Sequence, residues 1–151
     1  PIWYPRSSTP APGTKAALLS AVREGSVKPV HMHFLPAHHA TDYARWYTAS
    51  DPYRAKYEYM YEPYFVVDKR GLPLYDLRFT GYGNDKSSHA YELHAAGYTF
   101  IVHPTAFATH MQHAPTKWAD AADLGASWRR WWRFKEDVRK AYGFSMPLPR
   151  W

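Results

Sequence analysis

Nine histidines are the side chains of this sequence that are best suited to binding a metal or moving a proton near neutral pH. None of them forms the His-Glu-x-x-His spacing of a helical zinc site, and the absence of cysteine excludes thiolate ligands. His110 is distinctive because it ends an expected strand over 106–110 and is followed by Met-Gln-His-Ala-Pro. We therefore expect His110 to face a ligand at a sheet edge, and the other histidines to be ordinary buried or solvent-facing imidazoles.

Carboxylates near the middle of the chain are candidates for general-base catalysis. Glu62 precedes Pro63, where an expected strand breaks, and Asp76 and Asp85 flank a glycine-containing loop. A carboxylate in such a place can accept the proton of an attacking hydroxyl. Glu62 and Asp85 are therefore candidate bases, and the alternative for Glu62 is an ion pair with a basic neighbour such as Arg78.

The loop over 81–86 has the sequence Gly-Tyr-Gly-Asn-Asp-Lys and precedes an expected helix. Glycines in this position let backbone N–H groups approach an anion or a polar sugar closely. The spacing matches neither a P-loop nor a dinucleotide-binding fingerprint. The alternative is a tight turn in which Asp85 caps the helix that follows.

A third candidate surface is the segment 128–133, with the sequence Trp-Arg-Arg-Trp-Trp-Arg. Exposed tryptophan and arginine suit contact with nucleic acid or a membrane surface. The alternative is a packing helix whose arginines lie over its own apolar face.

Composition narrows the class of protein. The chain has 151 residues, 46% of them hydrophobic, which suffices for a packed core and excludes wholesale disorder. No apolar run approaches the ~18 residues of a membrane span, and no signal-peptide pattern opens the chain. The net charge of +6 favours anionic partners, and an aromatic content of 18% suits a ring-rich core or a surface that stacks on sugars or bases.

Helices and strands are expected to alternate, so the fold class is α/β or α+β. The capping residues Thr14 and Gly25 delimit the first helix, and the alternating aromatics of 57–67 are the clearest strand pattern. The last helix has an expected apolar face of Leu124, Trp128, Trp131, Val138 and Tyr142. We expect helices over 15–24, 42–49, 86–96 and 117–142, and strands over 27–34, 57–67, 98–103 and 106–110.

Taken in order, the motifs of the chain resemble the LARGE-type glycosyltransferases of family 49, which include the LARGE glucuronyltransferase domain and the β-1,4-glucuronyltransferase of the dystroglycan pathway. The resemblance covers roughly residues 9–144. It is carried by Lys15-Ala-Ala-Leu-Leu-Ser, His38-x-x-Thr-Asp-Tyr-Ala-Arg-Trp46, Tyr61-Glu-Pro-Tyr-Phe-Val-Val67, Tyr75-Asp-x-Arg-Phe-x-Gly-Tyr-Gly83, Asp85-Lys86, Tyr91-Glu-Leu93 and His110-Met-x-His-Ala-Pro115.

This resemblance implies a GT-A fold with a mixed sheet flanked by helices, Mn²⁺, and a UDP-sugar donor. The implied reaction transfers a sugar such as glucuronic acid to a glycan acceptor with inversion. By the same resemblance, His110 is a metal ligand and Glu62 and Asp85 are catalytic candidates. The implied substrate-binding residues are His38, Asp76, Arg78, Gly83, Asn84 and Lys86.

Two departures from the family pattern matter. Position 85 holds Asp where the family carries Asn, which favours Glu62 as the base. No Asp-x-Asp occurs in the sequence, although GT-A enzymes hold their metal with that motif on an earlier strand. We therefore expect the acceptor-side, C-terminal half of a catalytic domain over 14–144, between an extended proline-rich lead-in over 1–13 and a tail over 145–151.

The remaining expectations concern the whole protein. A chain that begins at Pro1 without methionine suggests a processed or truncated polypeptide, and without an Asp-x-Asp we expect these residues to be inactive alone. A missing N-terminal half or a partner chain would then cover an exposed sheet face that includes Tyr59 and Tyr61. Resemblance implies a type II membrane protein of the Golgi lumen. The alternatives are a non-catalytic subunit of a larger, for instance organellar, assembly and, less favoured, a nucleic-acid-binding module.

Overall fold

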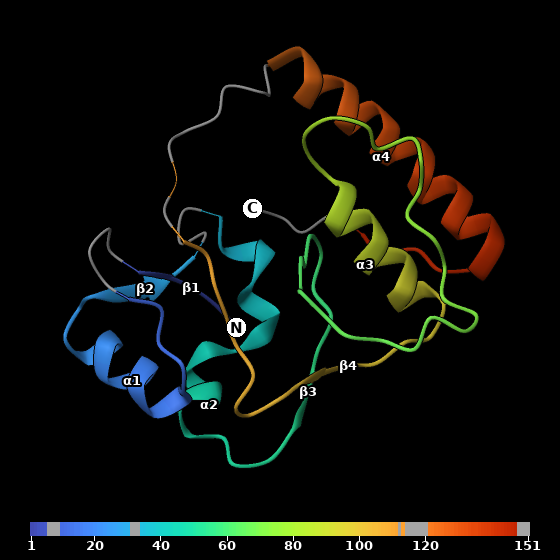
Figure 1. Ribbon diagram of the computed structural model, residues 1–151. Coiled ribbons are helices and arrows are strands. Elements are labelled where there is room, and N and C mark those ends of the chain that lie inside the picture. The colour runs from blue at the N-terminus through green and yellow to red at the C-terminus, as the bar shows by residue number, and fades with distance from the viewer. Residues whose placement is uncertain (6–9, 31–33, 112, 114–120, 148–151) are drawn as a thin grey trace. The chain divides into compact units, whose positions relative to one another are not determined.

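The computed structural model describes residues 1–5, 10–30, 34–111, 113 and 121–147. Helices and strands alternate along the chain, which confirms the expected mixed α/β class (Figure 1). The chain gathers into two compact units: unit 1 comprises Pro1–Lys56 and Phe100–Pro115, and unit 2 comprises Tyr57–Thr99 and Thr116–Trp151. Each unit combines two separate stretches of sequence, so no single point along the chain marks a boundary between them.

Unit 1 contains two small sheets. In the first, β1 lies between β2, to which it is antiparallel, and β5, to which it is parallel. In the second, β3 and β4 are antiparallel. The strands are β1 (Ile2–Pro5), β2 (Val27–Pro29), β3 (Tyr53–Ala55), β4 (Phe100–Val102) and β5 (Ala108–Thr109).

Both α-helices of unit 1 begin directly after a capping side chain; Thr14 was predicted as a cap, whereas Asp42 was expected as the first helical residue. Thr14 accepts a hydrogen bond from the backbone N–H of Ala17 and starts α1 (Lys15–Arg23). Asp42 accepts one from the N–H of Arg45 and starts α2 (Tyr43–Thr48). The 3₁₀ turns η1 (Leu35–Ala37) and η2 (His39–Thr41) precede α2.

Tryptophans form the centre of unit 1. Trp3 and Trp46 have no exposed surface, and their ring centroids lie 6.2 Å apart. Leu18 of α1, Val27 of β2 and Val102 of β4 are buried in the same cluster. The buried Trp46 indole donates a hydrogen bond of 3.0 Å to the carbonyl of His103, so its polar atom is satisfied.

Unit 2 is built on α3 (Asp85–Ala95) and α4 (Ala121–Tyr142), which pack side by side (Figure 1). The ring of Tyr91 on α3 meets Trp131 and Phe134 on α4 edge to face, with centroids 5.6 and 6.2 Å away. Edge-to-face rings are a favourable way to fill a core. The high aromatic content therefore serves packing in this unit.

The predicted strand over 57–67 is wrong. Met60 has a positive φ of 66°, and the N–H of Tyr61 bonds to the carbonyl of Glu58, so the segment turns instead of extending. Tyr59 and Tyr61 are only 6% and 3% exposed, which also contradicts the expectation of a bare face at these two rings. Tyr59 accepts a hydrogen bond from the indole of Trp131, so the core of unit 2 itself covers this ring.

Other expected elements differ in extent. The strand over 27–34 ends at Pro29, and 31–33 lie outside the described residues, as do 114–120 before α4. The buried side of α4 consists of Ser127, Trp131, Phe134 and Val138, whereas the predicted members Leu124, Trp128 and Tyr142 are 39–41% exposed. Among the described residues, no helix combines the length and hydropathy needed to cross a bilayer.

Candidate functional site

Glu62 and Lys86 come together at the start of α3. Lys86 Nζ lies 3.3 Å from Glu62 Oε2, and the carboxylate side chain is 17% exposed. Burial is the largest single influence on the pKa of the Lys86 ammonium and lowers it, but the charge and hydrogen bond of Glu62, together with Tyr64 and Asp85, raise the pKa overall. The partner of Glu62 is thus Lys86, not Arg78.

The glycine loop is anchored to α4 by Ser127. The hydroxyl of Ser127 donates to the carbonyl of Gly83 at 2.6 Å and accepts from the Asn84 side-chain amide at 3.1 Å. Asn84, with φ of 63°, ends the loop as the residue before α3. The predicted substrate-binding residues Gly83 and Asn84 are therefore held rigidly, and Asn84 uses its amide for this contact.

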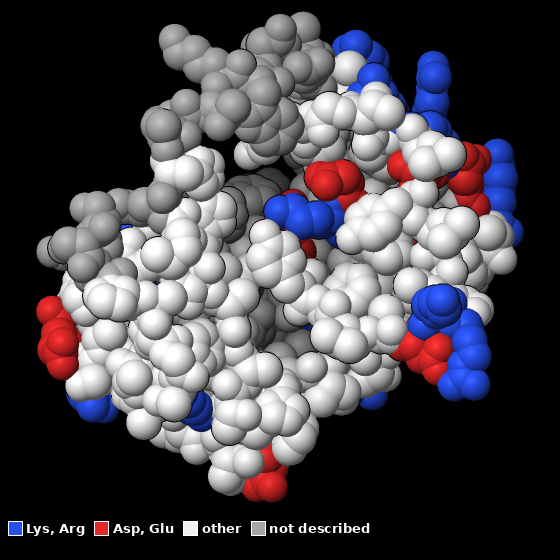
Figure 2. Space-filling model, in the orientation of Figure 1, with Lys and Arg blue, Asp and Glu red and all other residues white. Residues whose placement is uncertain are grey.

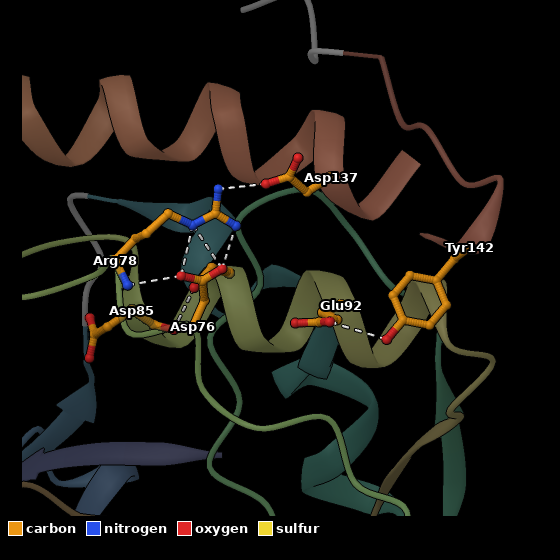
Figure 3. A network of polar contacts seen from close by, with 7 residues as sticks. Asp76, Arg78, Asp85, Glu92, Asp137 and Tyr142 are labelled. Atoms are coloured by element: carbon orange, nitrogen blue, oxygen red, sulfur yellow. Dashed lines mark hydrogen bonds and ion pairs between the residues drawn. The ribbon is translucent and has the colours of Figure 1, made fainter. Parts of the chain in front are cut away.

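Asp85 is the first residue of α3, so the prediction that it caps the helix is wrong. Its backbone carbonyl accepts a hydrogen bond from the Ser88 hydroxyl. Within the described part of the chain, its carboxylate has no hydrogen-bond or ion-pair partner, and it stands apart from Asp76 and Arg78 (Figure 3). It remains a candidate base with an available carboxylate.

Asp76 and Arg78 form a clamp that reaches α4 (Figure 3). Arg78 Nε lies 2.9 and 3.0 Å from the two carboxylate oxygens of Asp76, and Nη1 lies 2.6 Å from Asp137 Oδ2 on α4. Hydrogen bonds from Arg78 lower the pKa of Asp76, and those bonds raise the pKa of the guanidinium in turn. The contacts make both residues structural, because they tie the loop before α3 to the long helix.

His110 directly follows β5, as predicted, and belongs to unit 1. Its ring stacks on Tyr4 with centroids 5.2 Å apart, and its Nε2 lies 3.3 Å from Nε2 of His113. His38, the other predicted residue in this unit, is 8% exposed beside η2. His110 is thus oriented by an aromatic neighbour and has a second imidazole nitrogen near it.

The surroundings of His110 suit a side chain that supplies one ligand to a metal ion. The described residues include no group of three or more His, Asp or Glu side chains that could hold a metal ion. An imidazole on the partly exposed end of a strand can supply one nitrogen ligand.

The basic segment of α4 is mostly a solvated surface. In Figure 2, Lys and Arg gather along the upper right edge, where α4 lies, with acidic groups among them. Trp131 is buried, Arg139 pairs with Glu136 at 2.7 Å, and Lys135 donates to the carbonyl of Met146. The Lys135 ammonium also lies over the ring of Tyr59, with burial lowering its pKa. Within the segment 128–133, Trp131 packs in the core, whereas Trp128 and Trp132 are 41% and 49% exposed, so both interpretations of the segment stay predictions.

Ser127 and Asp137 were missed by the sequence analysis, although they hold the loop residues in place. Ser127 lies one helical turn before Trp131, so it shares the buried side of α4. A small polar residue one turn before a buried tryptophan could have indicated a buried hydrogen bond at Ser127. Asp137 had none, because an acidic residue on an exposed helix face is common.

Comparison with known proteins decides the family. A family model of glycosyltransferase family 49, described as "Glycosyl-transferase for dystroglycan", matches residues 1–143. The chain belongs to this family. It is 42% identical to xylosyl- and glucuronyltransferase LARGE2s of Gallus gallus over 138 residues, which is 87% of this chain and 18% of that protein.

Two other relatives of this family 49 chain show the same coverage. It is 38% identical to xylosyl- and glucuronyltransferase LARGE1 of Homo sapiens over 140 residues, 89% of this chain and 18% of that protein. It is 37% identical to glycosyltransferase-like protein gnt15 of Dictyostelium discoideum over 111 residues, 73% of this chain and 22% of that protein. The chain thus spans about a fifth of the length of these relatives.

Proposed function

We propose that this chain is part of a Mn²⁺-dependent, inverting glycosyltransferase. The reaction moves glucuronic acid or a similar sugar from a UDP-sugar to a glycan acceptor. The observation that carries the proposal is the family match over residues 1–143, nearly the whole chain. The LARGE relatives are named xylosyl- and glucuronyltransferases, so xylose and glucuronic acid are the first two sugars to test.

The chemistry needs a base for the acceptor hydroxyl. As that hydroxyl attacks the anomeric carbon of the donor, Glu62 or Asp85 takes its proton, and the bond from the sugar to UDP breaks with inversion. Glu62 lies 3.3 Å from the ammonium of Lys86, which holds the carboxylate in place. Asp85 has the more available carboxylate, so the structure leaves two candidates with different environments.

His110 would supply one metal ligand, and two acidic ligands would come from polypeptide outside this chain. When bound, the metal offsets the charge that develops on the diphosphate. We infer that these 151 residues alone are inactive, since they contain no Asp-x-Asp. By family resemblance, we place the whole protein in the Golgi lumen as a type II membrane protein. A non-catalytic subunit of a larger assembly is the alternative.

A transfer assay on the full-length protein tests the proposal. UDP-glucuronic acid and UDP-xylose are supplied with Mn²⁺ and para-nitrophenyl xyloside or glucuronide, and glycoside extension and UDP release are measured. We expect extension of a glycoside with at least one donor, lost on chelation. No transfer with any donor and acceptor combination would contradict the enzyme and favour the structural subunit.

The same assay separates the two candidate bases. Replacing the true base, by Glu62→Gln or Asp85→Asn, lowers kcat by about 10²–10⁴-fold with the donor KM unchanged. The other substitution leaves kcat close to that of the parent protein. Asp68→Asn, which alters an exposed carboxylate paired with Arg70, is the matched control. Near-normal kcat in both variants would show that neither carboxylate is the base.

A further inference from the structure

Two tyrosines with exposed rings stand near the Glu62–Lys86 pair. Tyr64 is 60% exposed, and Lys86 Nζ lies 5.6 Å from its ring centroid. Tyr75 is 51% exposed, and its pKa is raised by burial and by the charge of Asp85, with Lys86 acting in the opposite direction. Tyr64 thus lies near Lys86 and Tyr75 lies against His89, two residues of α3 that are three positions apart, so both rings lie along the same face of that helix. Neither ring belongs to the core of unit 2.

The ring of Tyr75 packs against the buried ring of His89. The His89 ring is 3% exposed on α3, and its centroid lies 3.9 Å from that of Tyr75. His89 Nε2 lies 2.8 Å from the carbonyl of Pro73; because a carbonyl only accepts, the imidazole donates. Phe65 contacts the same imidazole at 5.7 Å. A buried, hydrogen-bonded ring therefore occupies one side of Tyr75 and leaves the other side available.

This combination of groups suits a sugar ring. One face of a pyranose carries C–H groups that stack on aromatic rings, and its hydroxyls need charged or polar partners, which the Glu62–Lys86 pair provides. Opposite charges side by side do not select strongly for an anion or a cation. The exposure of both tyrosines fits a ligand that lies across the surface, as a glycan does, better than an enclosed small molecule.

We propose that Tyr64 and Tyr75 form a stacking platform for a pyranose ring of the acceptor glycan, next to the Glu62–Lys86 pair. The platform rests on the proposed function, because it positions the acceptor beside one of the two candidate bases. Its role is to bind and orient the acceptor. Binding of the donor is assigned to the proposed metal at His110.

Steady-state kinetics of the full-length protein test the platform, with UDP-glucuronic acid as donor and para-nitrophenyl xyloside as acceptor. Loss of one stacked ring in Tyr75→Ala or Tyr64→Ala raises the acceptor KM about tenfold. Tyr75→Phe and Tyr64→Phe retain the ring and stay near the parent KM. Leu77→Ala is the matched control, since Leu77 is an apolar residue of the same loop that is 89% exposed. We expect the donor KM to be unchanged in every variant, and kcat to be unchanged in Leu77→Ala.

Several outcomes overturn the platform: an unchanged acceptor KM in the alanine variants, a rise confined to the donor KM, or an equal effect of Leu77→Ala. If the full-length protein transfers no sugar, the proposed function fails and saturation-transfer NMR with the same glycoside decides the platform separately. Saturation that reaches the glycoside in the parent and is lost in Tyr75→Ala supports it. No saturation in the parent overturns it.

Discussion

At the scale of single residues, two Asp-x-Arg turns in unit 2 have the same local contacts and different surroundings. Asp68 and Arg70 pair on the surface, where their side chains are 55% and 88% exposed. Asp76 is 18% exposed, and its partner Arg78 also reaches Asp137 on α4. Exposed ion pairs contribute little to stability, whereas a pair that joins two segments constrains both. Only the second turn should matter to the folded state.

Asp76→Asn is expected to loosen this clamp in a pH-dependent way. The pKa of Asp76 is lowered in the folded protein by its hydrogen bonds to Arg78. Its stabilisation is therefore present above the ordinary aspartate pKa of about 4 and is lost as the pH falls through the lower folded value. At pH 7 the substitution should reduce hydrogen-exchange protection of α4 by about 1 kcal/mol in the full-length protein.

The control for this measurement is Asp68→Asn, which should leave α4 protected at every pH. The difference between Asp76→Asn and the parent should disappear in strong acid, where the parent carboxylate is itself protonated. An effect of Asp76→Asn that persists in strong acid would contradict the ionic origin of the clamp.

At the scale of elements, the helices were predicted more closely than the strands: β2, β4 and β5 lie within expected strands but are shorter, and β1 and β3 were not expected. Thr14 and Asp42 cap their helices through side-chain oxygens, a local interaction that the sequence displays directly. The aromatics of 57–67 alternate as a strand does, yet Met60 turns the chain and the rings enter a helical core. Alternation of aromatic and polar residues indicates which side chains are buried, but it does not indicate whether a sheet or a helix buries them.

For the candidate site residues too, local positions could be predicted from the sequence and contacts between distant segments could not. The positions of Glu62 and Lys86 on either side of the glycine loop were visible in the sequence, but their pairing was not, because it depends on the turn at 59–60. Contacts to α4 were also beyond the sequence. Ser127 bonds to Gly83 across 44 positions, and Arg78 reaches Asp137 across 59.

The loop before α3 gives a prediction at this scale. Gly83 has φ of 97°, and a Cβ added there would lie 3.4 Å from Ser127 Oγ and 3.5 Å from Leu124 Cδ2. These are ordinary van der Waals distances, so Gly83→Ala carries mainly a backbone strain of about 1–2 kcal/mol, at a residue whose carbonyl accepts the hydroxyl of Ser127. Gly97→Ala, at φ of 89° with open space around it, carries the strain alone.

We expect Gly83→Ala to lower the hydrogen-exchange protection of α3 and α4 more than Gly97→Ala does, in the full-length protein. It should also slow sugar transfer if the loop contacts substrate. Equal effects of the two substitutions would show that the contact of the loop with Ser127 does not restrict position 83.

At the scale of the whole molecule, the two units carry different parts of the proposed chemistry. Unit 1 contains His110, the predicted metal ligand, and unit 2 contains Glu62 and Asp85, the candidate bases. The chain spans about a fifth of its relatives' length, which agrees with further metal ligands lying elsewhere in the protein. In the proposed reaction the metal would act on the leaving group and the base on the acceptor, so the two roles can be tested separately.

Calorimetric titration of UDP into the full-length protein, with and without Mn²⁺, tests the central claim most directly. His110→Ala is compared with His103→Ala, a control at another exposed histidine of unit 1. We predict that UDP binds the parent and the control only with Mn²⁺, and that His110→Ala weakens this binding about tenfold or more. The account would be contradicted if the affinity for UDP were the same with and without Mn²⁺, or the same in His110→Ala as in the parent.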